Sequence, residues 1–144
     1  MKIVGDGAVQ TDKTVSSGSV TLDTAAAVVH VGFGYNSDAK LLRIEAGSAD
    51  GTALGKIRKI TGAALLVHRT RGLQIGMSFD SMLNVPFPDT NDELGHAPVL
   101  YSGLVRAEIE SSSDLENQIC LRQSDPMPGI ILAVAPQMVT QDRA

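Results

Sequence analysis

The 144-residue sequence has no tryptophan and few other aromatic residues, with only two tyrosines and three phenylalanines. Proteins that bind sugars or unpaired bases commonly stack them on exposed aromatic rings, so this scarcity disfavours both functions. A single cysteine, Cys120, excludes an intramolecular disulfide framework. We expect its thiol to be structural, because it alternates with Ile119 and Leu121 inside a predicted strand.

Long apolar runs and an excess of positive charge are also missing. No run approaches the ~20 apolar residues that span a bilayer, and we expect neither a membrane segment nor a secretory signal peptide. The net charge is −4, and the densest basic stretch is only Lys56, Arg58 and Lys59. Strand alternation would divide these three side chains between two faces. We therefore expect no meaningful affinity for DNA.

Every sequence motif for catalysis or metal binding that we considered is either absent or only partly present. No Gly-x-Ser-x-Gly elbow presents a nucleophilic serine, and Gly32-x-Gly34 is only part of a dinucleotide fingerprint. The three histidines and Cys120 lack the spacing of zinc ligands. Residues Asp89–Gly95 carry oxygen ligands at alternate positions, as calcium loops do, but a solvated acidic loop explains them more simply. We predict no enzyme activity, no cofactor and no metal.

Turn-forming residues and alternating apolar residues are abundant instead. Fourteen glycines and six prolines predict short strands joined by turns. Residues 56–68 form the longest predicted strand, and Gly62 within it marks a bulge or a close backbone approach. Leu104–Glu110 alternates apolar residues with charged ones. We predict an all-β fold, a single antiparallel β-sandwich-like domain over residues 1–144.

Shorter strands are predicted in the first half of the chain. Residues 1–22 have the spacing of a small β-hairpin lead-in made of a pair of hairpins, with turns at Gly5-Asp6-Gly7 and Ser16-Ser17-Gly18. Strands are then expected at Thr24–Val31, Leu41–Ala46 and Leu73–Met77, because apolar residues alternate there or cluster between turns.

The stretch around which we expect the chain to be organised is its last, Gln118–Val139. Two strand-like runs, Gln118–Arg122 and Ile130–Val134, flank a turn stiffened by Pro126 and Pro128. We predict that the runs pair as a hairpin that acts as a folding centre. In it Leu132 is buried, Gly129 supplies a positive φ, and Arg122 pairs with Asp125.

The same stretch resembles the closing segment of the tail nozzle (tail tube) proteins of short-tailed bacteriophages. QICLRQSDPMPGIILAV matches a turn that leads into the family's final hydrophobic strand. Ala27–Tyr35, Gly55–Ile60 and Arg71–Gly76 are similar to three further elements of that family, in the same order. Two departures are Gly34, where the family usually has proline, and Met127, where it usually has leucine.

The resemblance implies a virion protein, made in the host cytoplasm, that forms a sixfold ring with copies of itself around the DNA ejection channel. Its other partners would be the adaptor ring and the tail fibres, with genomic DNA passing through without specific binding and no membrane contact. In the family this domain usually closes a longer chain, so we expect the C-terminal part of a nozzle protein, either as a fragment or as a split gene product. The residues expected to have structural or interaction roles are Phe33, Tyr35, Arg122, Asp125, Pro126 and Pro128.

The main alternative is a carbohydrate-binding or host-adhesion module, which is a common use of β-sandwiches. Such a module would need exposed aromatic rings, and exposure of Phe33 and Tyr35 together in a shallow groove would favour it.

Overall fold

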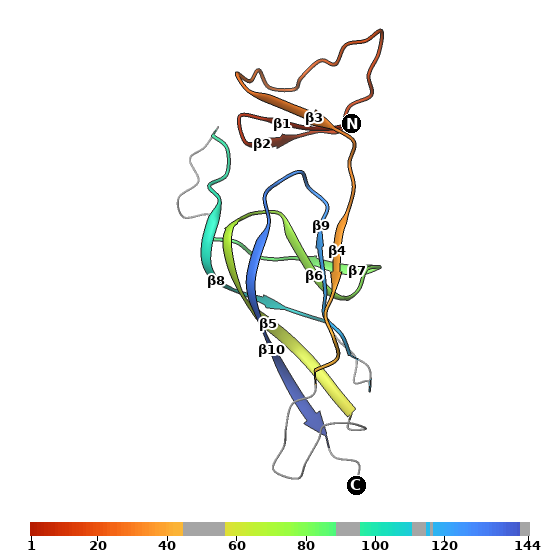
Figure 1. Ribbon diagram of the computed structural model, residues 1–144, viewed down its shortest axis with the longest axis vertical. Coiled ribbons are helices and arrows are strands. Elements are labelled where there is room, and N and C mark those ends of the chain that lie inside the picture. The colour runs from red at the N-terminus through yellow and green to blue at the C-terminus, as the bar shows by residue number, and fades with distance from the viewer. Residues whose placement is uncertain (45–56, 89–95, 111–114, 116, 142–144) are drawn as a thin grey trace.

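The structure is a computed structural model that describes residues 1–44, 57–88, 96–110, 115 and 117–141 (Figure 1). Within them the chain forms strands and no helix. The strands are β1 (Lys2–Gly5), β2 (Ala8–Gln10), β3 (Val29–Gly32), β4 (Ser37–Lys40), β5 (Ile57–Thr70), β6 (Leu73–Ser78), β7 (Ser81–Asn84), β8 (Tyr101–Glu108), β9 (Cys120–Gln123) and β10 (Ile130–Gln141).

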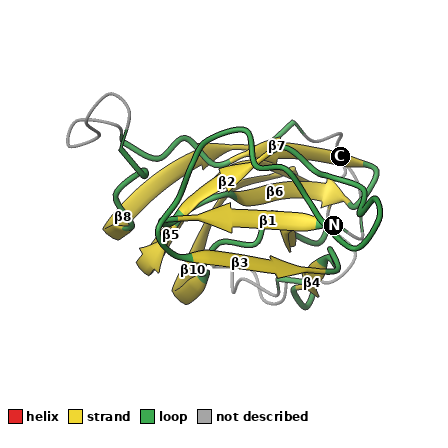
Figure 2. Cartoon of the chain, turned by 90° about the horizontal axis from the view of Figure 1, so that it is seen from above, coloured by secondary structure: helices red, strands yellow, loops and turns green. Residues whose placement is uncertain are grey.

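Two antiparallel sheets form the body, with strand orders β10-β5-β8 and β4-β9-β6-β7. Apolar side chains of both sheets make one buried cluster, with Leu65 and Val67 from the first sheet and Leu73, Ile75 and Leu121 from the second. A third, smaller sheet, β2-β1-β3, lies at one end of the body (Figure 1) and is in front of it when the molecule is seen from above (Figure 2). The all-β, sandwich-like fold predicted from the sequence is therefore confirmed.

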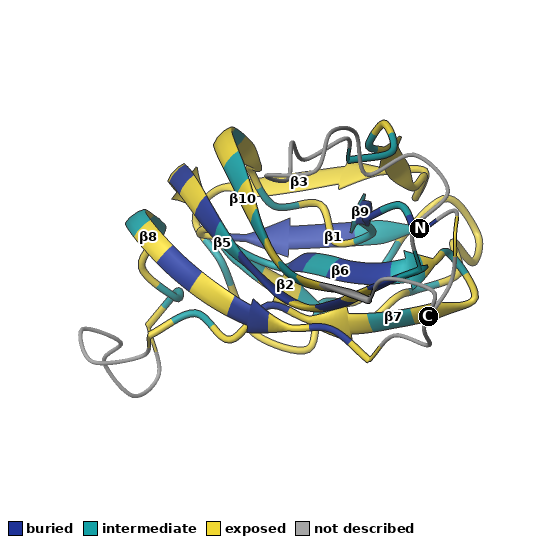
Figure 3. Cartoon of the chain, turned by 90° about the horizontal axis from the view of Figure 1, so that it is seen from below, coloured by how far each residue is buried: buried dark blue, intermediate teal, exposed yellow. Residues whose placement is uncertain are grey.

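Strands β5 and β8 carry the clearest alternation, visible as bands of burial in Figure 3. Gly62 has both features expected of it. Gln137 pairs with Gly62 and Met138 with Ile60, so Thr61 is the extra residue of a bulge. A Cβ on Gly62 would lie 2.9 Å from the carbonyl oxygen of Ala107, which shows how closely the two backbones approach.

The first half of the chain departs from the prediction at two strands. Leu41–Ala46 was expected to be a strand, but residues 41–44 are not, and residues 45–46 lie outside the described part. The strand is β4, just before them, whose four residues are all exposed. Strand β4 is an edge strand that pairs only with β9, so it needs no apolar alternation.

Only the end of the predicted strand Thr24–Val31 is a strand, namely β3. The backbone before it is held by a side chain, because the amides of Ala27 and Val28 donate to the Asp6 carboxylate at 2.9 and 2.8 Å. These two hydrogen bonds lower the pKa of Asp6. They also fix the entry of the chain into β3.

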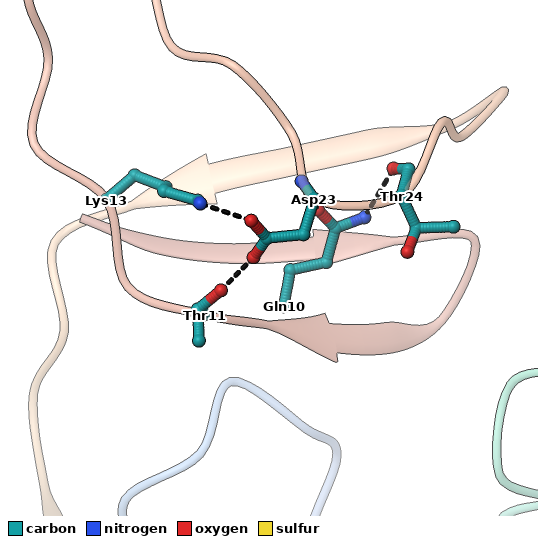
Figure 4. A network of polar contacts seen from close by, with 5 residues as sticks. All are labelled: Gln10, Thr11, Lys13, Asp23 and Thr24. Carbon is teal, nitrogen blue, oxygen red and sulfur yellow. Dashed lines mark hydrogen bonds and ion pairs between the residues drawn. The ribbon is translucent and has the colours of Figure 1, made fainter.

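The N-terminal lead-in contains one hairpin rather than two. Asp6 and Gly7 have φ of 48° and 87°, as the tight turn between β1 and β2 requires. The second predicted hairpin reduces to a single bridge between Ser16 and Ser19. A polar network ties the segment that follows β2 to residues 23–24 (Figure 4): Asp23 accepts hydrogen bonds from Thr11 and Lys13, and Gln10 donates to the Thr24 carbonyl oxygen at 2.9 Å.

The prediction that the last two strands pair as a C-terminal hairpin is wrong. Strand β9 pairs with β4 and β6, whereas β10 pairs with β5 in the other sheet. Residues 124–129 therefore cross from one sheet to the other. We call this segment the arch. Gly129 does not have a positive φ, and Leu132 is 62% exposed at a bulge of β10. Because the arch changes sheets, the chain needs no tight reversal of direction within one sheet.

Candidate functional site

The predicted interaction residues Phe33, Tyr35, Pro126 and Pro128 come together in one place. Phe33 and Tyr35 lie on the connection between β3 and β4 and are 86% and 78% exposed. Both line two adjoining hollows, of about 530 and 490 Å³, whose shared wall also includes Pro126. Pro128 lines the larger hollow. We call the two hollows together the arch groove.

The small sheet forms one side of the arch groove and the body forms the other. The register of β1 with β3 pairs Val4 with His30, and both residues line the larger hollow. Leu100 and Met127 line the opposite side. The larger hollow is therefore mainly apolar, and the exposed rings of Phe33 and Tyr35 stand beside it.

The smaller hollow is more polar, and Gln123 at the end of β9 is its most constrained residue. The Gln123 Nε2 group donates to the carbonyl oxygens of Arg71, Met127 and Asp125, at 2.9, 3.2 and 3.3 Å. These contacts fix the orientation of the carboxamide, because only its amino group can donate to carbonyl oxygens, and its two hydrogens are shared among the three. The opposite atom, Oε1, is buried and has no hydrogen-bond partner among the described residues.

Gly129 leaves space next to this unpaired acceptor. A Cβ placed on Gly129 would lie 3.3 Å from Gln123 Oε1. Gly129, Ser124 and Asp125 all line the smaller hollow with Gln123. The arch thus provides a rigid carbonyl acceptor and a carboxylate at the polar end of the groove.

Arg122 supports the start of the arch from outside the groove. Its guanidinium forms a bidentate pair with Asp38, with both N–O distances at 2.7 Å, and also donates to the Phe79 carbonyl oxygen at 3.0 Å. The predicted pair with Asp125 is therefore wrong. Register explains the difference, because Asp38 lies directly opposite Arg122 in the β4–β9 pair and shares its face.

The ion pair shifts the pKa of both partners. The hydrogen bonds from Arg122 hold the pKa of the Asp38 carboxyl below its usual value, and the same pair raises the pKa of Arg122. The guanidinium carbon of Arg122 also lies 5.0 Å from the centre of the Phe79 ring. Both contacts fix the Arg122 side chain at the junction of β9, β4 and the β6–β7 turn.

The other candidate residues are the histidines, Cys120 and the acidic loop. No group of three His, Cys, Asp or Glu residues in the described part of the chain could hold a metal ion. The acidic loop Asp89–Gly95 lies outside the described residues. Cys120 is buried, burial raises the pKa of its thiol, and the thiol lies 3.7 Å from the Met77 carbonyl oxygen, as expected of a structural thiol.

One surface histidine does contact a serine. His68 Nδ1 lies 3.3 Å from Ser102 Oγ, which also accepts a hydrogen bond from the Arg69 amide at 2.9 Å. Arg69 has a φ of 46°. The contact therefore holds the strained end of β5 against β8.

Gln123, Lys2 and Gly129 line the groove but were not singled out as site residues from the sequence. Gln123 has one sequence signal, its position immediately before a proline-rich turn, where a carboxamide can bind several backbone carbonyl groups. Lys2 has none, because the distance along the chain between Lys2 and the arch hides their proximity.

Comparison of the chain with models of known protein families and with curated proteins finds no match. No helix in the described residues is long and apolar enough to cross a membrane.

Proposed function

We propose that this chain is a structural component of a phage tail nozzle that assembles with copies of itself into a sixfold ring around the DNA ejection channel. Two observations support the proposal. The first is the resemblance of four sequence elements, in order, to the tail nozzle family. The second is the structural observation on which the proposal mainly depends. It is an apolar surface on the outside of the β10-β5-β8 sheet.

This outer face is defined by the residues that pair across the three strands. Leu66 of β5 lies opposite Ala133 of β10 on one side and Leu104 of β8 on the other. Directly paired residues share a face, so the three form a continuous apolar row. Leu66 is 39% exposed, Leu104 55% and the neighbouring Leu132 62%. Large apolar side chains gathered on one face of a sheet are typical of a surface that another protein covers.

The occupant that we propose for this outer face is a neighbouring copy of the chain. A ring is closed by a heterologous contact, in which the outer face of one copy meets a different surface of the next. The adaptor ring and the tail fibres are the other proposed partners, and they follow from the resemblance alone. In this proposal the role of the protein is structural rather than catalytic.

The basic residues are consistent with a channel through which DNA passes without being held. Arg58 is only 2% exposed, and its guanidinium donates to the carbonyl oxygens of Ile44 and Leu115. Lys59, the next residue, is exposed on the opposite face of β5. Phosphate binding needs cations gathered on one accessible face, and β5 separates these two.

Electron microscopy of the purified protein tests the proposal. We expect class averages of closed rings with a central opening and sixfold symmetry. Particles that are uniformly single small domains, at all concentrations that can be imaged, would contradict it. Leu104→Glu places a charge in the apolar row and should reduce the number of rings, whereas Leu42→Glu, at an 86% exposed position away from that row, should not.

A further inference from the structure

We propose that the arch groove is a saccharide-binding site. This inference goes beyond the ring function, because it concerns a different surface from the outer face of the β10-β5-β8 sheet. It depends on two features that lie next to each other in the structure: a pair of exposed aromatic rings and an unpaired, buried hydrogen-bond acceptor.

The aromatic pair is the first feature. Phe33 and Tyr35 are among the most exposed large side chains in the described part of the chain, and both line the groove. Two exposed rings side by side in a groove form an apolar patch, and covering such a patch with a ligand is favourable. The C–H face of a pyranose is a flat, weakly apolar surface that packs on such rings, while its hydroxyl groups stay free for polar contacts.

The unpaired acceptor is the second feature. Leaving a buried carbonyl oxygen without a donor costs free energy, and Gln123 Oε1 has no donor among the residues that the structure describes. Its carboxamide cannot turn to relieve this, because Nε2 is held by three backbone carbonyl groups. Because Oε1 is buried, a donor from a ligand satisfies it only when the arch shifts slightly, and Gly129, which has no side chain, is the residue beside Oε1 that permits such a shift.

A sugar hydroxyl fits this requirement well. It is a donor and an acceptor at once, so it can donate to Gln123 Oε1 or to the Asp125 carboxylate and accept from a neighbouring group. Asp125 lines the same hollow as Gln123 and the two aromatic residues. A proline-rich peptide would also pack on the rings, but it has few N–H groups to offer to two acceptors. The groove therefore favours a saccharide over such a peptide.

A glycan array of neutral and acidic oligosaccharides, probed with the tagged full chain, is the test. We expect retention of at least one glycan class, followed by a measurable Kd in calorimetry with the same oligosaccharide. Tyr35→Ala and Phe33→Ala should each weaken binding about tenfold or more, because each removes one ring of the pair. Gly129→Ala should also weaken it, since its new Cβ crowds Gln123 Oε1 and blocks a donor.

The matched control is Leu42→Ala, which removes an apolar side chain that is 86% exposed, as Phe33 is, but does not line the groove. It should leave the Kd unchanged. Thermal unfolding of each variant shows whether it is folded, and all four positions are exposed. A silent array, or a Kd that Tyr35→Ala and Gly129→Ala both leave unchanged, would overturn the proposal. If the glycan array is silent and a displayed peptide library yields peptides that bind the groove, the groove is a peptide-binding site instead.

Discussion

Arg122 and Asp38 form a bidentate ion pair between β9 and β4, with Nε–Oδ1 and Nη2–Oδ2 both at 2.7 Å. The pair joins the strand that leads into the arch to an edge strand made entirely of exposed residues. Strand β4 has little apolar surface to hold it in the sheet. We therefore expect the pair to matter for the position of the β3–β4 connection, and with it for Phe33 and Tyr35.

The ion pair predicts a pH-dependent stability difference between the wild type and Asp38→Asn. The folded-state pKa of Asp38 is lowered, chiefly by the hydrogen bonds from Arg122. Its stabilising contribution is therefore present above the unfolded-state pKa of ~3.9 and is lost as the pH falls through the folded-state value. The Tm of the variant should be lower at neutral pH, and the difference should close on acidification below about pH 4.

Asp125→Asn is the control for this measurement, since Asp125 is the residue that the sequence suggested as the partner of Arg122. It should leave the Tm at neutral pH almost unchanged. A difference between wild type and Asp38→Asn that stays constant from neutral to strongly acidic pH would show that the carboxylate charge is not responsible.

Two leucines in the same sheet should respond very differently to truncation. Leu65 of β5 is fully buried in the core, so Leu65→Ala should lower the free energy of unfolding by ~2–5 kcal/mol. Leu132 is 62% exposed at a bulge of the single chain, so in the dissociated chain Leu132→Ala should change it by about 0.5 kcal/mol or less. Urea unfolding of both variants provides the comparison. Equal losses in the dissociated chain would mean that Leu132 is packed within its own chain and does not belong to the exposed outer face.

Replacing Gly62 and Gly34 by alanine should have different effects, because Gly62 lies against a backbone atom and Gly34 against a flexible side chain. A Cβ at Gly62 would meet the Ala107 carbonyl oxygen at 2.9 Å, and this backbone atom cannot move without disturbing the β5–β8 pair. We expect Gly62→Ala to cost ~1–3 kcal/mol. At Gly34 the Cβ would meet Lys2 Cγ at the same distance, but the lysine side chain can move aside.

Gly34→Ala should therefore have little effect, and Gly34 does not have the positive φ that would make a side chain costly. Gly34→Pro, which places at this position the residue usual in the tail nozzle family that the sequence resembles, should be tolerated as well. Thermal unfolding of Gly62→Ala, Gly34→Ala and Gly34→Pro tests this order of stability losses. A severe loss at Gly34 would count against the proposed correspondence between this connection and the similar element of the tail nozzle family.

The chain should not bind duplex DNA at physiological salt. Non-specific DNA-binding proteins show Kd values of ~10⁻⁴–10⁻⁶ M under these conditions. A fluorescence anisotropy titration with labelled duplex should show no saturation in this range. Micromolar binding that weakens steeply with added salt would contradict a channel that lets DNA slide past.

The sequence was informative wherever one face of a strand is buried. The alternation of β8, the long strand β5 and the role of Gly62 could all be predicted, because burial imposes a period of two on the residue pattern. Strand β4 could not, since an exposed edge strand needs no such pattern. The arch was misjudged for a different reason. Local sequence identifies two strands and a turn, but not whether the strands share a sheet.

The candidate site shows the same limit. Phe33, Tyr35, Pro126 and Pro128 were identified because each is unusual in its own segment, and the fold does bring them together. The partner of Arg122 was wrong, since it depends on the register between two strands that are far apart in the chain. The unpaired oxygen of Gln123 depends on three backbone carbonyl groups from two separate segments, and no local pattern predicts it.

The central claim is that copies of the chain assemble through the outer face of the β10-β5-β8 sheet, and native mass spectrometry tests it most directly. The chain has a mass of 15.1 kDa. We predict a dominant species of six copies for the wild type and for Leu42→Glu, and a shift towards single chains for Leu104→Glu. A wild type that remains a single chain at every concentration, or a Leu104→Glu variant that assembles as fully as the wild type, would contradict the account.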